Sequence, residues 1–190
     1  MRMLRGVMAL MVAGGISGAA AAGSIADKGA EAEKQFAAGQ PIAAIETLDS
    51  AVAKIWDTMP LTVRRAVLVE SVSGYGIYAP RDKPAFGPGE AIVIYVEPIG
   101  FAYGKDSLGA GQIAFDIDLA IEDEAGTQVL QRENFVSVET PVRYRNREFH
   151  LTVNLNLSGA PTGKYVGRFL LKDRHSDKTA EFDVPFEIAG

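Results

Sequence analysis

The chain has 190 residues, a formal net charge of −5 at pH 7 and 47% hydrophobic residues, which is typical of a folded domain with a sizeable core. An acidic chain without a basic stripe is a poor candidate for nucleic-acid binding. It contains no cysteine, which excludes disulfides, thiolate metal sites and a cysteine nucleophile. Apolar side chains must therefore stabilise the fold.

The first residues have the three parts of a secretory signal peptide. Two arginines form a basic start, residues 6–16 are apolar, and a run of four alanines ends at Ala22. This order predicts that residues 1–22 are removed during export. An uncleaved membrane anchor is the alternative, but a span needs ~20 apolar residues in a row. We therefore expect a periplasmic or secreted protein with no membrane span after cleavage.

Residues 24–60 carry the three- and four-residue spacing of amphipathic helices. A first helix over residues 27–38 is expected to end at Gly39, and Pro41 is expected to open a second helix that ends at Pro60. The two helices should form an antiparallel hairpin whose apolar stripe packs on the domain that follows. The side chains expected to make this contact are Ile45, Leu48, Val52 and Trp56.

Within residues 61–190 the hydrophobic period changes to two, which predicts β-strands. One apolar and one polar face per strand is typical of antiparallel sheets packed as a sandwich. The sequence therefore predicts a mainly β fold, an antiparallel β-sandwich with an N-terminal α-helical hairpin. The expected strands cover residues 66–73, 76–78, 91–96, 112–122, 128–136, 148–157, 164–172 and 179–188.

Two segments of the sandwich resemble bacterial immunoglobulin-like modules. Residues 86–90, Phe-Gly-Pro-Gly-Glu, are similar to the turn before their second strand, and residues 163–186 are similar to their last hairpin. Tyr165 matches a tyrosine that caps a corner in such folds. The resemblance implies an immunoglobulin-like sandwich, a fold that does not fix a function.

The helical hairpin resembles the junction and second helix of one tetratricopeptide unit. The residues that carry this resemblance are Gly39, Gln40, Pro41, Ala44, Leu48 and Ala51. No second copy follows, and such repeats need about three copies to bury their faces. A helix pair that packs on the neighbouring domain is therefore the favoured interpretation.

The sequence contains no pattern of a catalytic or metal site. His150 is expected on the polar face of a strand and His175 in a turn, and neither has a serine and an acid placed for nucleophilic catalysis. Asp116, Asp118 and Glu122 lie in a row on one strand face, which suits a solvated acidic surface better than the converging oxygens of a calcium site. We therefore predict no enzyme, no metal and no cofactor.

Aromatic and basic residues gather in two connections outside the regular alternation, at residues 101–103 and 143–147. Alternate connections of an antiparallel sandwich lie at opposite ends, and counting strands places both segments at one end, with the turn at residues 173–178. Tyrosine and arginine are favoured at binding surfaces. The alternative is that the aromatic rings of residues 101–103 close the core. The predicted binding residues are Phe101, Tyr103, Arg143, Tyr144, Arg145, Arg147 and His175.

These patterns together predict an exported, non-enzymatic binding or structural module of the cell envelope. The expected partner is an envelope protein or polysaccharide whose acidic groups accept paired hydrogen bonds from arginine. The alternative is a carbohydrate-binding accessory module in which exposed tyrosine or phenylalanine rings stack on sugars.

Overall fold

The computed structural model describes residues 24–190, and these form two compact units. The first ends at Val52 and the second runs from Ala53 to Gly190. The predicted signal peptide, residues 1–22, lies outside the described residues. No helix of the described part is long and apolar enough to cross a membrane.

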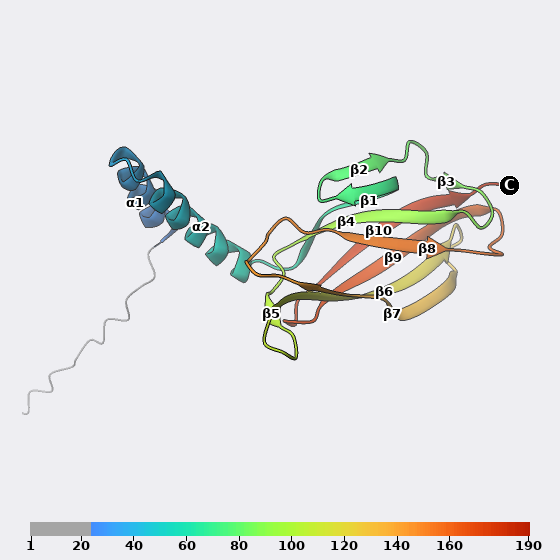
Figure 1. The fold of residues 1–190 in the computed structure, drawn as a ribbon. Coiled ribbons are helices and arrows are strands. Elements are labelled where there is room, and N and C mark those ends of the chain that lie inside the picture. The colour runs from blue at the N-terminus through green and yellow to red at the C-terminus, as the bar shows by residue number, and fades with distance from the viewer. Residues whose placement is uncertain (1–23) are drawn as a thin grey trace, which may run out of the picture. The chain divides into compact units, whose positions relative to one another are not determined.

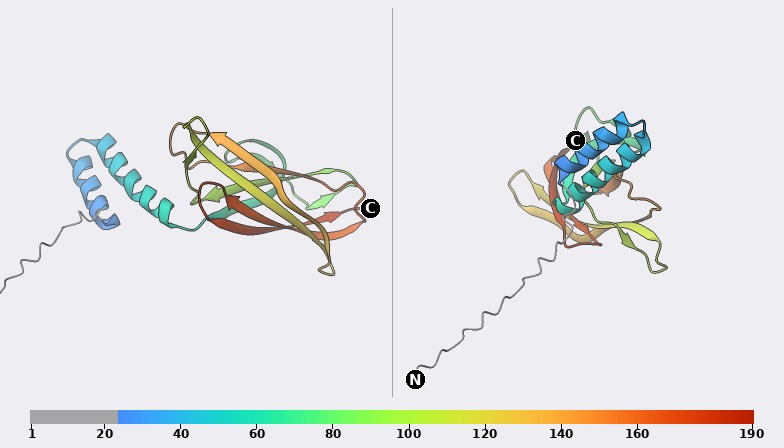
Figure 2. Two further views of the ribbon diagram at one scale, coloured as in Figure 1. Left: turned by 90° about the horizontal axis from the view of Figure 1, so that it is seen from below. Right: turned by 90° about the vertical axis from the view of Figure 1, so that its left-hand side faces the viewer.

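The first unit is built from two helices, α1 (Ile25–Ala37) and α2 (Pro41–Thr58), of which α2 continues into the second unit. Ser24 opens α1 with a capping box, in which its hydroxyl accepts the Asp27 N–H and the Asp27 carboxylate accepts the Ser24 N–H. Gly39 ends the helix at φ 75°, a conformation that glycine adopts without strain. The predicted antiparallel hairpin is confirmed (Figure 1, Figure 2).

Small side chains fill the contact between the two helices. Within residues 24–52 the buried residues are Ala32, Ala44 and Ala51. Across the pair the Thr47 hydroxyl donates to Gln35 Oε1 at 2.9 Å. The larger side chains of the apolar stripe are exposed in the structure. The exposed fractions of Ile45, Leu48 and Val52 are 62%, 48% and 41%.

The second unit is a β-sandwich of two sheets, antiparallel as the sequence predicts apart from one short parallel pair (Figure 1). The first sheet has the order β2-β1-β4-β8, with bounds Ile77–Pro80, Thr62–Gly74, Ala91–Ile99 and Leu151–Asn156. The second has the order β3-β10-β9-β6-β5, with bounds Ala85–Phe86, Thr179–Ile188, Gly163–Asp173, Gly111–Asp123 and Gly104–Lys105. In addition β7 (Gln128–Pro141) pairs with β6, and the two form the long hairpin that runs diagonally in the left view of Figure 2.

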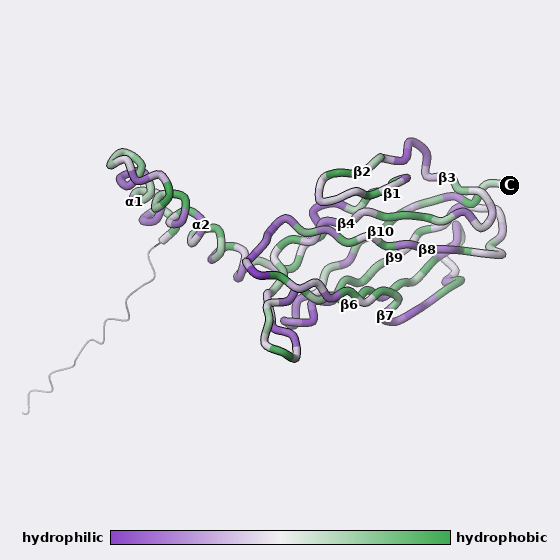
Figure 3. The backbone as a smooth tube through the Cα atoms, viewed as in Figure 1, coloured by the Kyte–Doolittle hydropathy of each residue, from purple (hydrophilic) through white to green (hydrophobic). Residues whose placement is uncertain are grey.

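The core lies between the sheets and follows the period of two. The tube in Figure 3 changes between hydrophobic and hydrophilic colours along several strands. On β6 the inward side chains of Phe115, Ile117 and Ile121 are fully buried, whereas Asp116 and its polar neighbours face outward. Burial of this much apolar area is the main stabilising contribution to a chain without disulfides.

Three strand details differ from the sequence prediction. The strand expected from residue 66 begins already at Thr62, and it forms a hairpin with β2 because the chain turns at Gly76 with φ 68°. The short strands β3 and β5 have two residues each, too few to show a period. The strand expected from residue 148 begins at Leu151, because the residues before it belong to a loop.

Tyr165 makes the corner contact that the resemblance implies. Its hydroxyl donates to the Pro161 carbonyl oxygen at 2.8 Å, and its ring stacks on Phe186 with centroids 5.7 Å apart. This bond closes the turn before β9 in the way a tyrosine corner does.

Candidate functional site

One end of the sandwich, which we call the loop end, is formed by residues 100–103, 142–150 and 174–178. Asp173, at the end of β9, is buried and joins two of these segments. Its carboxylate accepts the Ala102 N–H at 2.7 Å, the Ser176 hydroxyl at 2.7 Å and the His175 N–H at 2.9 Å. A buried carboxylate with three donors fixes the loops that supply them.

The last turns of α2 also hold residues 100–103. Trp56 is buried, and its Nε1–H donates to the Phe101 carbonyl oxygen at 2.7 Å. Lys178 also contacts this segment. Its ammonium donates to the carbonyl oxygen of Gly100 at 2.8 Å and to that of Asp57, in α2, at 3.1 Å. The loop end therefore rests on three elements, α2, β9 and the turn before β10.

Two hydrogen bonds, at Val142 and Asn146, attach the loop of residues 142–150 to neighbouring segments of the sandwich. Val142 N–H donates to the Gly111 carbonyl oxygen at 2.8 Å, and the Tyr103 hydroxyl donates to the Asn146 carbonyl oxygen at 2.8 Å. The guanidinium of Arg145 lies 4.7 Å from the centre of the Tyr103 ring, within cation–π range. The two predicted segments thus meet at one end of the sandwich.

Between Val142 and Asn146 the loop presents three exposed side chains, of which Arg143 and Tyr144 are not engaged by an ion pair in the described residues. Arg143 is exposed, and Tyr144 is 75% exposed. Arg145 pairs with Asp57, but Arg143 has no ion-pair partner among residues 24–190. An arginine without an ion-pair partner beside an exposed tyrosine offers a partner hydrogen-bond donors and an aromatic surface. Because the loop is held on both flanks, little conformational entropy is lost when it binds.

Two other predicted binding residues, Phe101 and Tyr103, are less exposed to solvent. Phe101 is 1% exposed and packs against Trp56, Phe115 and Phe149, so it closes the core, and its ring is not available at the surface. Tyr103 is partly buried; burial raises its pKa and the nearby Arg145 opposes that rise.

The imidazole of His175 is wedged against the chain at Gly104. A Cβ atom added to Gly104 would overlap Nδ1 of His175, so a larger residue fits here only if the imidazole moves. The Nε2 atom of His175 is buried without a hydrogen-bond partner in the described part of the chain. The predicted residue Arg147 is partly buried, and its side chain is not free of interactions.

Sequence reasoning missed the residues that hold the loop end together. Asp173 ends a strand and is followed three residues later by Ser176, which is a spacing typical of an aspartate-initiated turn. That signal predicts a turn but not the contact with Ala102. The pairing of Lys178 with Gly100 joins residues far apart in the chain, and no local pattern indicates it.

A second polar cluster lies on the outer face of the first sheet. The Glu97 carboxylate is 5% exposed and accepts from Arg64 Nη2 at 2.6 Å and from the Tyr95 hydroxyl at 2.9 Å. Burial works against its charge, but these hydrogen bonds outweigh it and hold the pKa of Glu97 below its ordinary value. The rings of Tyr78 and His150 cover Tyr95. Because Arg64, Tyr95 and Glu97 are hydrogen-bonded to one another, the cluster joins β1 to β4 and is not the best candidate site.

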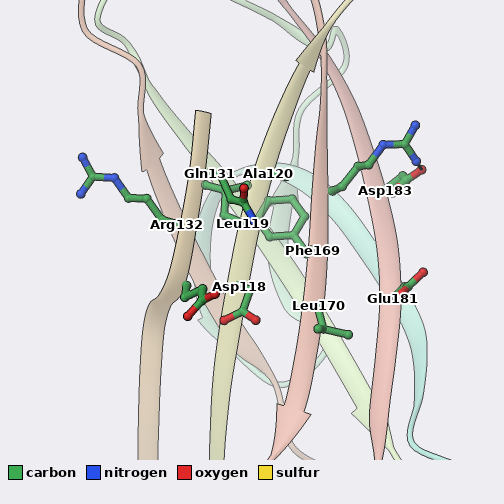
Figure 4. A pocket seen from close by; sticks show the side chains of 11 residues that line it. Asp118, Leu119, Ala120, Gln131, Arg132, Phe169, Leu170, Glu181 and Asp183 are labelled. Atoms are coloured by element: carbon green, nitrogen blue, oxygen red, sulfur yellow. Dashed lines mark hydrogen bonds and ion pairs between the residues drawn. The ribbon is translucent and has the colours of Figure 1, made fainter. Parts of the chain in front are cut away.

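A shallow hollow of about 290 Å³ crosses the outer face of the second sheet over β7, β6, β9 and β10 (Figure 4). Arg168 there pairs with Glu122 at 2.9 Å and with Asp183 at 3.0 Å. The Asp118 carboxylate accepts from Lys172 at 2.7 Å; this bond and the Asn134 N–H outweigh the effect of burial and lower its pKa. Asp118, Glu122 and Asp183 are thus paired with cations, which fits a solvated ionic surface.

The chain matches no protein-family model, and no curated protein sequence matches it. It is similar in structure to CopC from Methylosinus trichosporium OB3b, at 15% identity and a TM-score of 0.31 over 66% of this chain and 94% of that one. A superoxide reductase (neelaredoxin) from Ignicoccus hospitalis is matched at 10% identity and a TM-score of 0.31, over 73% of this chain and 86% of that one.

A family 123 glycoside hydrolase from Clostridium perfringens is matched at 12% identity and a TM-score of 0.33, over 56% of this chain. The match spans 23% of the hydrolase. No family model matches a tetratricopeptide unit, so nothing beyond the sequence resemblance supports that interpretation.

The prediction that the chain is not an enzyme is corrected by these matches. Two of the three structures named above are enzymes, a superoxide reductase and a glycoside hydrolase. The exclusion rested on missing motifs in one sequence, whereas catalytic groups are brought together by the fold. We therefore withdraw it.

Proposed function

We propose that the second unit is an exported binding module whose loop end recognises carboxylate groups of an envelope protein or polysaccharide. Export is supported by the signal-peptide pattern of residues 1–22. A periplasmic or secreted location follows from that pattern, and it places the module among the acidic polymers and proteins of the envelope.

The observation that carries the proposal is the exposure of Arg143 and Tyr144 on a loop with fixed ends. On one side of them the Val142 N–H donates to the Gly111 carbonyl oxygen, and on the other the Asn146 carbonyl oxygen accepts from the Tyr103 hydroxyl. A surface that is already ordered loses less conformational entropy on binding. The guanidinium supplies two parallel donors for a carboxylate, and the tyrosine ring supplies area that a partner can cover.

The electrostatic setting also favours an anionic partner. The chain as a whole is acidic, but the loop end combines Arg143 with Arg145 and Lys178. Of these, Arg145 is engaged by Asp57, and Lys178 donates to backbone carbonyl oxygens, which leaves its charge without a carboxylate partner in the described residues. A local positive potential raises the association rate of an acidic ligand and is weakened by salt.

The direct test is titration of the folded protein with a glutamate-rich peptide, followed by calorimetry at low and high salt. We expect binding at low salt that weakens about tenfold in Arg143→Ser, the scale of one charged hydrogen-bonded contact. Arg132→Ser is the matched control, because Arg132 is also exposed and also lacks an ion-pair partner within residues 24–190. Equal affinity of the wild type and Arg143→Ser contradicts the proposal.

A separate experiment tests the carbohydrate alternative. That alternative is favoured if the wild type is retained on neutral polysaccharide, if Tyr144→Ser loses this retention, and if the peptide does not bind.

A further inference from the structure

The helical hairpin of the first unit carries an apolar surface that the unit does not cover. Its large side chains are 41–73% exposed: Ile25, Phe36, Ile42, Ile45, Leu48 and Val52. Patches of this kind on soluble proteins mark interaction sites. Among residues 24–52 only alanines are buried, and a hairpin of this length is marginal in water without tertiary contacts.

The surface is hollowed between the two helices. A groove of about 380 Å³ is lined by small residues, among them Gly29, Ala32 and Ala44, and by the large side chains of Phe36 and Ile45. A Cβ atom added to Gly29 meets no other atom within 4 Å, so the groove is open there. Each hairpin thus offers a protruding ring and a hollow that can receive one, which is the self-complementarity that a twofold contact requires.

We propose that a second copy of this chain covers the groove, so that two hairpins pack face to face as a four-helix bundle. Phe36, Ile45 and Leu48 line the groove and are 70%, 62% and 48% exposed, so together with the neighbouring apolar side chains a second copy would cover on the order of several hundred Å² per hairpin, the scale of the ~800 Å² per partner of a standard stable interface. Ile45, Leu48 and Val52 also follow one another at steps of three and four, the spacing of helices that pack side by side.

The charges of the hairpin are compatible with this contact. Glu33 is the one charged residue among those lining the groove. The other charged side chains of α1 are at helical positions away from the groove, at Asp27, Lys28, Glu31 and Lys34. Little charge is therefore desolvated, and the mild repulsion between two acidic chains is screened beyond ~10 Å at 0.1 M salt.

Sedimentation equilibrium of the full chain, purified after export from a bacterial host, tests the proposal. Ile45→Ser removes an apolar side chain from the groove, and Ile77→Ser is the matched control, because Ile45 is 62% and Ile77 64% exposed and Ile77 lies on β2. We expect dimers at about 10–100 µM for the wild type and the control. The dimer Kd should rise ~10-fold or more in Ile45→Ser, since each dimer carries the substitution twice.

Circular dichroism shows whether each variant keeps its helices and strands. If Ile45→Ser loses helix signal, Phe36→Ser on α1 serves as a second groove variant with the same expected rise in Kd. A wild type that is monomeric at ~100 µM overturns the proposal, whether or not a foreign protein copurifies with it. A dimer that both groove variants leave unchanged overturns it as well.

Discussion

Trp56 and Phe101 meet edge to face, with ring centroids 5.0 Å apart and planes at 88°, and the indole N–H of Trp56 donates to the Phe101 carbonyl oxygen at 2.7 Å. The contact joins a helix residue to the first loop of the sandwich. It makes the end of α2 part of the second unit, and it holds in place the loop of residues 100–103, which contains Tyr103.

Trp56→Ala should destabilise the sandwich by about 3–5 kcal/mol, the usual cost of removing a large buried ring. Trp56→Phe should cost less, because it keeps most of the packing and loses the hydrogen bond. Urea unfolding followed by circular dichroism measures both. Tyr144→Ala, at a site that is 75% exposed, is the control and should change stability by less than about 0.5 kcal/mol. A Trp56→Ala protein as stable as this control contradicts the buried contact.

Glu97→Gln should cost about 2 kcal/mol at neutral pH, less than the ~3–5 of a fully buried pair because the Arg64 side chain is half exposed. The pKa of Glu97 is lowered in the folded state. Its contribution is therefore present above the unfolded-state pKa and is lost as the pH falls through the folded-state pKa. Unfolding measured from about pH 7 down to about pH 3 should show a steeper loss of stability in the wild type than in Glu97→Gln. Parallel curves would argue against this role.

Tyr165→Phe should lower stability by about 1 kcal/mol, because it removes the hydrogen bond to Pro161 and leaves the ring in place. Thermal unfolding is a sufficient readout. The same substitution at the exposed hydroxyl of Tyr144 should leave the midpoint unchanged. If both variants unfold alike, the corner bond contributes nothing.

Gly104→Ala should disturb the loop end, since its Cβ would overlap the imidazole of His175. Gly87→Ala is the control, because there the nearest atom is a side-chain oxygen of Glu90 at 3.7 Å. Proton–nitrogen NMR spectra should show shifts around residues 100–103 and 174–178 in Gly104→Ala alone. Unperturbed His175 resonances in that variant would rule out the close contact.

The sequence predicted the sandwich well because its strands are long and each has one apolar face. Phe115, Ile117 and Ile121 show the period that the structure confirms. Short pairings such as β3 with β10 could not be predicted, because two residues carry no period.

The loop end was harder to predict than the strands. Strand counting brought residues 101–103 and 143–147 to one end, which the bond between Tyr103 and Asn146 supports. The same reasoning could not separate Phe101, which is buried, from Tyr144, which is exposed. That difference depends on packing against Trp56, 45 residues away in the chain.

Site-specific photo-crosslinking in cells tests the binding role of the loop end most directly. A photoreactive phenylalanine analogue placed at Tyr144, which is 75% exposed, is compared with one at Ile77, which is 64% exposed and lies on β2. We expect a discrete product with an acidic envelope component from position 144, reduced when Arg143→Ser is added, and none from position 77. The absence of any product at position 144, or an identical pattern from both positions, would contradict the account.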